Sequence, residues 1–137
     1  MSRSQKKRIA QALAELGVDI IEAGFANASD DDFASVKAIA DDIRGPTICA
    51  LARCQTNDIE SAGRALASAQ RSRIHVFIAT SDLHREHKLG MSKQQVIDAA
   101  MASVRRARDL CDEVEFSAED AMRTDPEYLA EVMAAVI

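Results

Sequence analysis

Short β-branched segments alternate with amphipathic helical segments along the chain, and this alternation is the feature that most constrains its fold. The segments that predict strands start near residues 18, 46, 73 and 113, about 27 residues apart with an insertion before the last. Strands that alternate with helices in this way form right-handed βαβ units, and therefore a parallel sheet. The predicted order is α-β-α-β-α-β-α-β-α in a single segment, residues 1–137, without a linker.

Capping residues mark the ends of the predicted helices. Gly17 follows the first helix, residues 4–16, where a glycine C-cap is expected. Polar residues that can accept a hydrogen bond from a helix N-terminus precede or begin the later helices. These expected caps are Ser29, Thr56, Ser92 with Gln95 in a capping box, and Asp125 before Pro126.

Two further local expectations come from the same reading. The first strand, residues 18–25, is a β-branched run bounded by glycines, and we expect both of its faces to be buried. Residues 81–91 are mostly polar and follow a strand, so we expect a loop that covers an active site. His84 and His87 in this loop lack the spacing of a zinc protease motif, which favours a lid over a zinc site.

Parallel α/β chains form either a doubly wound sheet or part of a (β/α)₈ barrel. Neither the G-x-G-x-x-G nor the G-x-x-x-x-G-K-[ST] phosphate loop occurs, which weighs against a nucleotide-binding doubly wound sheet. A complete barrel needs about 250 residues. The 137 residues therefore predict an α/β fold that is about half of a (β/α)₈ TIM barrel.

Composition excludes several classes of protein. The net charge of −5 argues against a nucleic-acid-binding protein, and no apolar run is long enough for a membrane span or a signal core. The three cysteines are odd in number and contain no C-x-x-C pair, which argues against a disulfide framework or a zinc knuckle. We therefore expect a cytoplasmic protein with reduced thiols and no nucleic-acid or membrane partner.

Ligands of parallel α/β folds bind at the carboxyl ends of the strands. Glu115, Ser117 and Glu119 alternate along the fourth strand and point to one face, and Glu119 follows the expected end of that strand. A partly buried carboxylate there suits proton transfer beside a carbonyl group. Two structural readings stay open: Glu115 can pair with an arginine of a neighbouring strand, and His75 can be a core histidine.

Four segments resemble 2-isopropylmalate synthases, which belong to the metal-dependent Claisen-condensing enzymes. Residues 16–25 (LGVDIIEAGF), 45–53 (GPTICALAR), 73–81 (RIHVFIATS) with His84 and Lys88, and 114–121 (VEFSAEDA) with Arg123 and Thr124 resemble the second to fifth barrel strands. The resemblance implies a (β/α)₈ barrel that joins acetyl-CoA to the 2-oxo acid 3-methyl-2-oxobutanoate in leucine biosynthesis. It also implies a divalent metal, Mg²⁺ or Mn²⁺, that polarises the oxo acid.

The resemblance implies roles for seven residues. Glu119 corresponds to the catalytic glutamate of the acid–base machinery. The positions that correspond to the substrate-binding region are His75 and Ser117 in the oxo-acid pocket, Leu51 against its alkyl group, and Glu22, Arg53 and Thr80 nearby. No residue corresponds to a metal ligand, because the family carries these on its first and seventh strands.

By the same resemblance, we expect the first strand, the C-terminal half of the barrel and the regulatory domain to lie outside these residues. The segment alone is then expected to be inactive and to form a homo-oligomer or depend on a complementary fragment. Homocitrate and citramalate synthases are alternatives within the enzyme class, because pocket size separates their oxo acids. A non-catalytic half-barrel that serves as an assembly module is the contrasting alternative.

Overall fold

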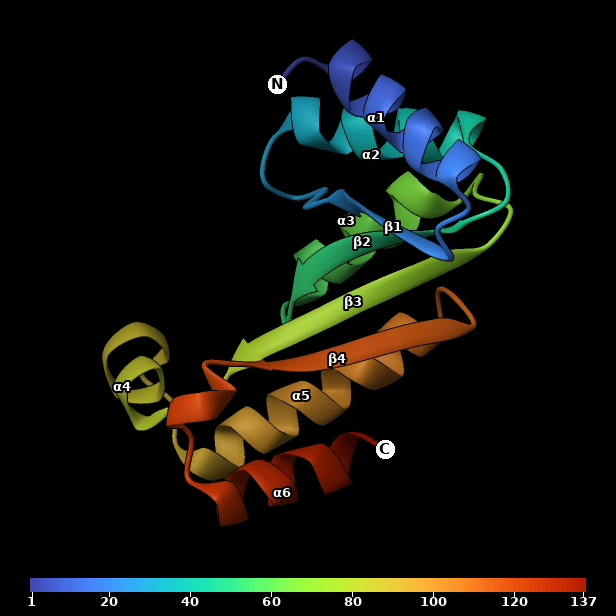
Figure 1. Cartoon of the computed structure of the whole chain (residues 1–137). Helices are drawn as coiled ribbons and strands as arrows, with labels where there is room; N and C mark the ends of the chain where they lie inside the picture. Colours follow the sequence, from blue (N-terminus) through green and yellow to red (C-terminus); the bar gives the residue numbers. More distant parts are fainter.

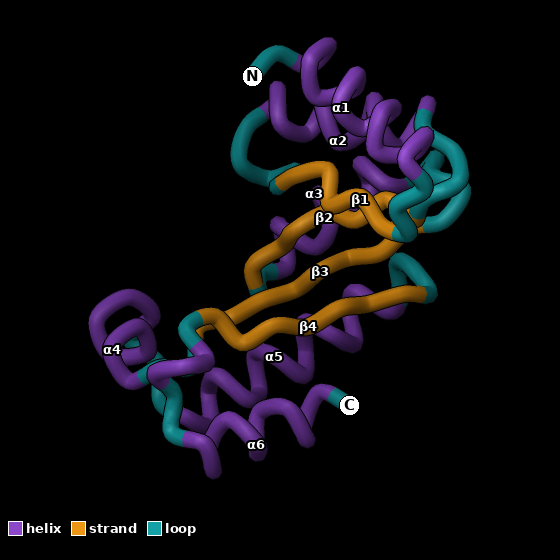
Figure 2. Tube along the Cα trace, in the orientation of Figure 1, coloured by secondary structure: helices purple, strands orange, loops and turns teal.

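The computed structural model describes residues 1–137 and contains one four-stranded sheet. The strands are β1 (Ile20–Gly24), β2 (Thr47–Arg53), β3 (Ser72–Ala79) and β4 (Glu113–Glu119). All three neighbouring pairs are parallel, and the strands follow each other across the sheet in their chain order (Figures 1 and 2). The predicted α/β class with a parallel sheet is therefore confirmed.

Helices connect each strand to the next. The longer ones are α1 (Arg3–Leu16), α2 (Asp30–Asp42), α3 (Thr56–Leu66), α5 (Lys93–Arg108) and α6 (Pro126–Val136). Figure 1 shows α1 and α2 at the β1 end of the sheet, and α5 and α6 at the β4 end. None of the helices combines the length and apolar composition that a membrane span requires.

Most of the predicted caps are present. Gly17 has a φ of 88° and its N–H bonds to carbonyls of the last helical turn, as a left-handed C-cap does. The side chains of Ser29, Ser92 and Asp125 each accept a hydrogen bond from the backbone three residues ahead, and Ser92 forms the full capping box with Gln95. These contacts satisfy helix N–H groups that have no partner within the helix.

Two local predictions are wrong. Gln55, not Thr56, is the N-cap of α3, and Thr56 is already the first helical residue. Residues 81–91 are not a plain loop, because they contain the short helix α4 (Asp82–His84) and the π-helical turn η1 (Arg85–Leu89). A 3₁₀ turn, η2 (Ala121–Arg123), also follows the end of β4.

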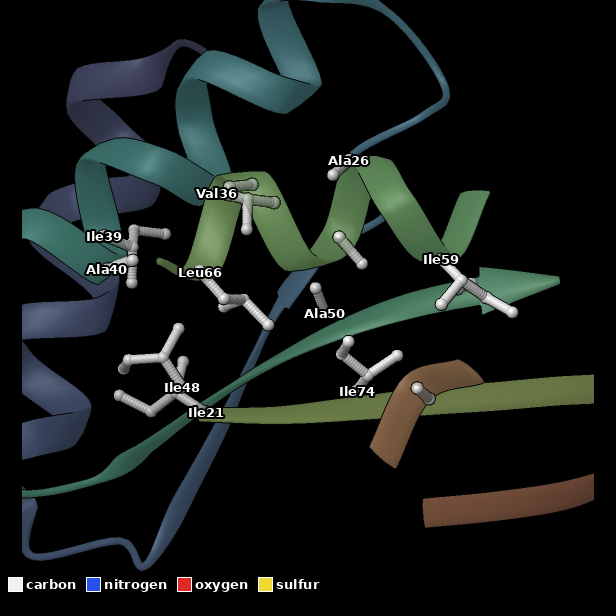
Figure 3. Close-up of a cluster of buried hydrophobic side chains, with 14 of the residues drawn as sticks. Ile21, Ala26, Val36, Ile39, Ala40, Ile48, Ala50, Ile59, Leu66 and Ile74 are labelled. Atoms are coloured by element: carbon white, nitrogen blue, oxygen red, sulfur yellow. The ribbon is translucent and has the colours of Figure 1, made fainter. Parts of the chain in front are cut away.

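The hydrophobic core lies between the sheet and the helices that cover one of its faces (Figure 3). Alternate residues of β2 and β3 point into it, and Ile48, Ala50, Ile74 and Val76 are almost fully buried. Fully burying an isoleucine or valine side chain stabilises a fold by about 1.5–3 kcal/mol, so this layer holds the sheet to its helices.

The opposite face of the sheet is polar. Its side chains include Glu22, Arg73, His75, Glu113, Glu115 and Ser117. The prediction that β1 is buried on both faces is wrong for this reason: Ile21 is 6% exposed on the helix side, but Ile20 is 39% exposed on the polar side. Because helices cover only one face, an apolar run in β1 does not bury every residue.

Candidate functional site

His75 lies at the centre of a hydrogen-bonded chain that crosses the polar face of the sheet. Its Nδ1 is 2.7 Å from Oε2 of Glu22 on β1, and its Nε2 is 2.7 Å from Oγ of Ser117 on β4. Leu51 on β2 is the register partner of His75, so it borders the imidazole on the same face. The structure thus brings together four of the seven predicted site residues.

The partners of His75 determine which ring nitrogen carries the proton. A carboxylate only accepts hydrogen bonds, so Nδ1–H of His75 donates to Glu22. In the neutral ring, Nε2 then accepts the hydroxyl hydrogen of Ser117.

Cys49 lies beside this chain but is not a nucleophile. Its Sγ donates weakly to Oε2 of Glu22 across 3.8 Å. Burial raises the pKa of the Cys49 thiol to about 12, and the negative charges of Glu22 and Glu115 add to the effect. Because the thiolate is the reactive form, this thiol is inert near neutral pH.

Glu115 has the structural role that the sequence left open. Arg73 on β3 reaches Glu115 at 3.2 Å and Glu113 at 3.0 Å, so one guanidinium links two carboxylates of β4. Glu115 also lies 3.9 Å from Nε2 of His75. Arg73 thereby neutralises negative charge at the amino-terminal side of the Glu22–His75–Ser117 chain.

Glu119 lies two residues beyond Ser117, at the carboxyl end of β4, and is held separately. Its two carboxylate oxygens are 2.8 and 3.0 Å from Nζ of Lys88, which η1 supplies. No hydrogen bond or ion pair joins it to His75 or Ser117. Glu119 and Lys88 line a pocket of about 130 Å³ whose other walls are mostly apolar and include Phe77, Leu89 and Met91.

Arg53 is fixed by a carboxylate that sequence reasoning missed. Its Nε is 2.6 Å and its Nη2 is 3.1 Å from the oxygens of Asp58, whose side chain is fully buried. The Arg53 N–H and the Asn27 amide also donate to Asp58, at 3.1 and 2.6 Å. The guanidinium stacks 5.2 Å from the Phe25 ring. This cluster ties the ends of β1 and β2 to the first turn of α3.

The Thr80 hydroxyl is not part of the Glu22–His75–Ser117 chain and bonds to Thr124 instead. The residue is fully buried, and its Oγ1 is 2.7 Å from Oγ1 of Thr124. Its N–H also donates to the carbonyl oxygen of Glu119. Thr80 therefore connects the ends of β3 and β4 and supports the backbone that carries Glu119.

The segment between β3 and α5 is anchored to the residue that follows Glu119. Nδ1 of His84 lies 3.0 Å from Oδ2 of Asp120, and Ser81 caps α4. A hydrogen bond from Ser81, with the charge of Arg123, holds the pKa of Asp120 below its usual value. Asp120 adopts a left-handed φ of 63°, which aspartate tolerates better than most residues. No group of three potential metal ligands occurs among residues 1–137.

Comparison with known proteins provides independent evidence on family and fold. Residues 1–137 match the HMGL-like family. The chain is 54% identical to the 2-isopropylmalate synthase of Methylibium petroleiphilum and 56% identical to that of Leptothrix cholodnii, over 137 residues in each case. It spans 27% of the length of each of these relatives.

A solved structure supports the barrel architecture. The HMG-CoA lyase of Bacillus subtilis matches 99% of this chain with a TM-score of 0.73 at 18% identity, and the match covers 48% of the lyase chain. At this identity the likeness concerns the fold alone. It confirms the predicted partial (β/α)₈ barrel.

Proposed function

The chain belongs to the HMGL-like family, and from this premise we propose that it forms part of the catalytic barrel of a 2-isopropylmalate synthase. The reaction converts acetyl-CoA, 3-methyl-2-oxobutanoate and water to 2-isopropylmalate and CoA. The observation that carries the proposal is the Glu22–His75–Ser117 chain, which fixes an imidazole and a serine hydroxyl side by side on the polar face of the sheet.

Each polar residue has a defined task in this proposal. His75 and Ser117 bind oxygens of the 2-oxo acid, and Leu51 contacts its alkyl group. Glu119 is the base that removes a proton from the acetyl methyl group, so that the resulting carbon nucleophile attacks the oxo carbon. The alkoxide formed at the former oxo carbon takes up a proton, which replaces the one that Glu119 removed from the methyl group. Water then cleaves the thioester and releases a carboxylate and CoA as a thiol.

A divalent metal, which the resemblance to 2-isopropylmalate synthases implies, does not fit the residues of this chain. His75 is engaged by Glu22 and Ser117 on its two ring nitrogens, and Glu119 is engaged by Lys88. No group of three side chains that could hold a metal ion occurs among residues 1–137. The proposed steps therefore use only the substrate contacts of His75, Ser117, Leu51 and Glu119.

We also propose that the chain acts in the cytoplasm. A second proposal is that its edge strands β1 and β4 pair with strands outside these residues. β1 and β4 each have a partner on one side only, and unpaired strand edges are prone to associate. Another copy of the chain or a complementary segment would satisfy these edges. Sedimentation should then show that the chain self-associates, or that it binds a complementary segment when one is added. A stable monomer that neither self-associates nor binds the segment would contradict this.

The test is a graft into a relative. The matching 137 residues of the Leptothrix cholodnii enzyme are replaced by this chain, and CoA-thiol release is measured with acetyl-CoA, 3-methyl-2-oxobutanoate and Mg²⁺ or Mn²⁺. We expect turnover with this oxo acid in preference to pyruvate or 2-oxoglutarate. The Glu119→Gln variant should lose about 10²- to 10⁴-fold in kcat, the usual contribution of a general base.

Glu15→Gln, on the exposed surface of α1, is the matched control and should leave turnover unchanged. Preference for pyruvate or 2-oxoglutarate would assign a citramalate or homocitrate synthase instead. A folded graft without turnover would contradict the proposal and favour a non-catalytic half-barrel. The 137 residues alone are expected to show no turnover, and a rate like that of the relative would refute this part.

A further inference from the structure

Lys88 contacts Glu119 where both residues line the pocket at the carboxyl ends of the strands. Nζ of Lys88 is within hydrogen-bond distance of both carboxylate oxygens, at 2.8 and 3.0 Å. Exposed pairs of this kind contribute only about 0–1 kcal/mol to stability. Since the Lys88 side chain is about half exposed, stability is a weak reason for its placement.

The backbone that carries Lys88 has an unusual form. Residues 85–89 make one π-helical turn that ends at Gly90 in the left-handed region, with φ 63°. Turns of this type are rare and are often found at functional sites. Arg85 donates to the Met91 carbonyl at 2.9 Å and closes the turn on itself. The turn is therefore a regular element held by hydrogen bonds and not an irregular loop.

Two successive residues of the chain hold this turn in place. Glu119 pairs with Lys88, and Oδ2 of Asp120 lies 3.0 Å from Nδ1 of His84 on the preceding helix α4. The His84–Asp120 contact is the less exposed of the two, whereas Lys88 and Glu119 line the pocket.

We propose that Lys88 is a positioning residue that orients the Glu119 carboxylate toward the pocket at the carboxyl ends of β2, β3 and β4. The role rests on the proposed function, in which Glu119 transfers the proton. A carboxylate that rotates freely presents the correct oxygen to the substrate for only part of the time. A cation that contacts both oxygens removes this freedom, and misplacement of a catalytic group by about 1 Å can cost 10²-fold in rate.

The first test measures the orientation of Glu119 without any activity. In the isotopically labelled 137-residue chain, NMR couplings across χ1 of Glu119 should report one dominant rotamer. They should move to rotamer-averaged values in Lys88→Met and stay close to the original values in Lys88→Arg, because a guanidinium also binds both carboxylate oxygens. Averaged couplings in the unaltered chain, or unchanged couplings in Lys88→Met, would overturn the proposal.

Lys37→Met is the matched control, since Lys37 pairs with Asp41 at 2.8 Å with similar exposure but lies on α2 away from the polar face. It should leave the Glu119 couplings unchanged. Amide spectra of every variant establish that the fold is kept, so an effect on Glu119 cannot arise from unfolding.

The second test uses the graft described above. Lys88→Met should lower kcat by about tenfold to a hundredfold and change KM for the oxo acid by less than about threefold, with partial recovery in Lys88→Arg. A raised KM with unchanged kcat would make Lys88 a binding residue and overturn the proposal. A graft with no turnover before any substitution would count against the proposed function alone, and the couplings would still decide the role of Lys88.

Discussion

Asp58 is the buried charge whose removal should damage the protein most clearly. Its side chain is fully buried and accepts four hydrogen bonds, from the Asn27 amide, the Arg53 N–H and two guanidinium nitrogens of Arg53. Asp58→Ala deletes all four acceptor contacts at once. We therefore expect lower stability together with a loosened Arg53.

The expected loss of stability depends on which hydrogen-bond donors of Asp58 can bond to water after the substitution. The Arg53 side chain is about half exposed, so its guanidinium regains water and its part of the ion pair contributes little. Asn27 is exposed as well, so its amide also regains water. The Arg53 N–H loses a charged acceptor, and such a loss costs about 1–3 kcal/mol. We expect the free energy of unfolding to fall by about 2 kcal/mol, which lowers Tm by roughly 6 °C in a domain of this size.

The effect should depend on pH in a direction that the structure determines. Burial raises the pKa of Asp58, but hydrogen bonds from Arg53 and Asn27 outweigh burial, so the net pKa lies below the usual 3.8. A group with a depressed pKa stabilises the fold above its unfolded pKa and loses that contribution as the pH falls through its folded pKa. The difference between the two proteins should therefore be full at pH 7 and shrink below about pH 4.

Urea unfolding followed by circular dichroism at pH 7 and pH 3 measures both quantities. Asp31→Ala is the control, because Asp31 pairs with Arg3 at 2.9 Å with both side chains more than half exposed. It should cost less than about 1 kcal/mol. Equal losses for Asp58→Ala and Asp31→Ala at pH 7 would refute the reasoning from burial.

Two further predictions concern the polar face. Glu22→Ala removes the acceptor of the His75 Nδ1–H. We expect ¹⁵N spectra of the imidazole to change from the Nδ1–H tautomer to a mixture of both tautomers, because the Ser117 hydroxyl can donate or accept. An unchanged tautomer would contradict this. Since burial raises the pKa of Cys49 to about 12, iodoacetamide should alkylate it at pH 8 at least about a hundredfold more slowly than in the urea-unfolded chain, as measured by mass spectrometry. Equal rates in the two states would count against the buried thiol.

Local chemistry made much of the fold predictable. Gly17, Ser29 and Ser92 act within one turn of backbone, so their capping roles do not depend on the rest of the molecule. The spacing of the strands predicted the parallel sheet in a similar way, because the alternation of strand and helix can be read from the sequence of each βα unit. The burial of β1 was mispredicted because it depends on what covers each face of the sheet, which the strand itself does not encode.

The site was predictable in its residue types but not in its pairings. Alternation placed Ser117 and Glu119 on one face, and the sequence could not reveal that Ser117 binds His75 while Glu119 binds Lys88. The π-helical turn that brings Lys88 to Glu119 has no simple sequence signal. Asp58 was missed because a carboxylate in the first turn of a helix ordinarily interacts with the helix N-terminus.

Strand order in this sheet repeats chain order, so each strand pairs with strands that are only one helical connection away. No strand has to insert between two that are already joined. The sheet can therefore assemble by stepwise addition of neighbouring units, which keeps the entropy cost of each chain closure small. Fraying should begin at the terminal units, and the β2–β3 pair should be the last part of the sheet to lose its backbone pairing.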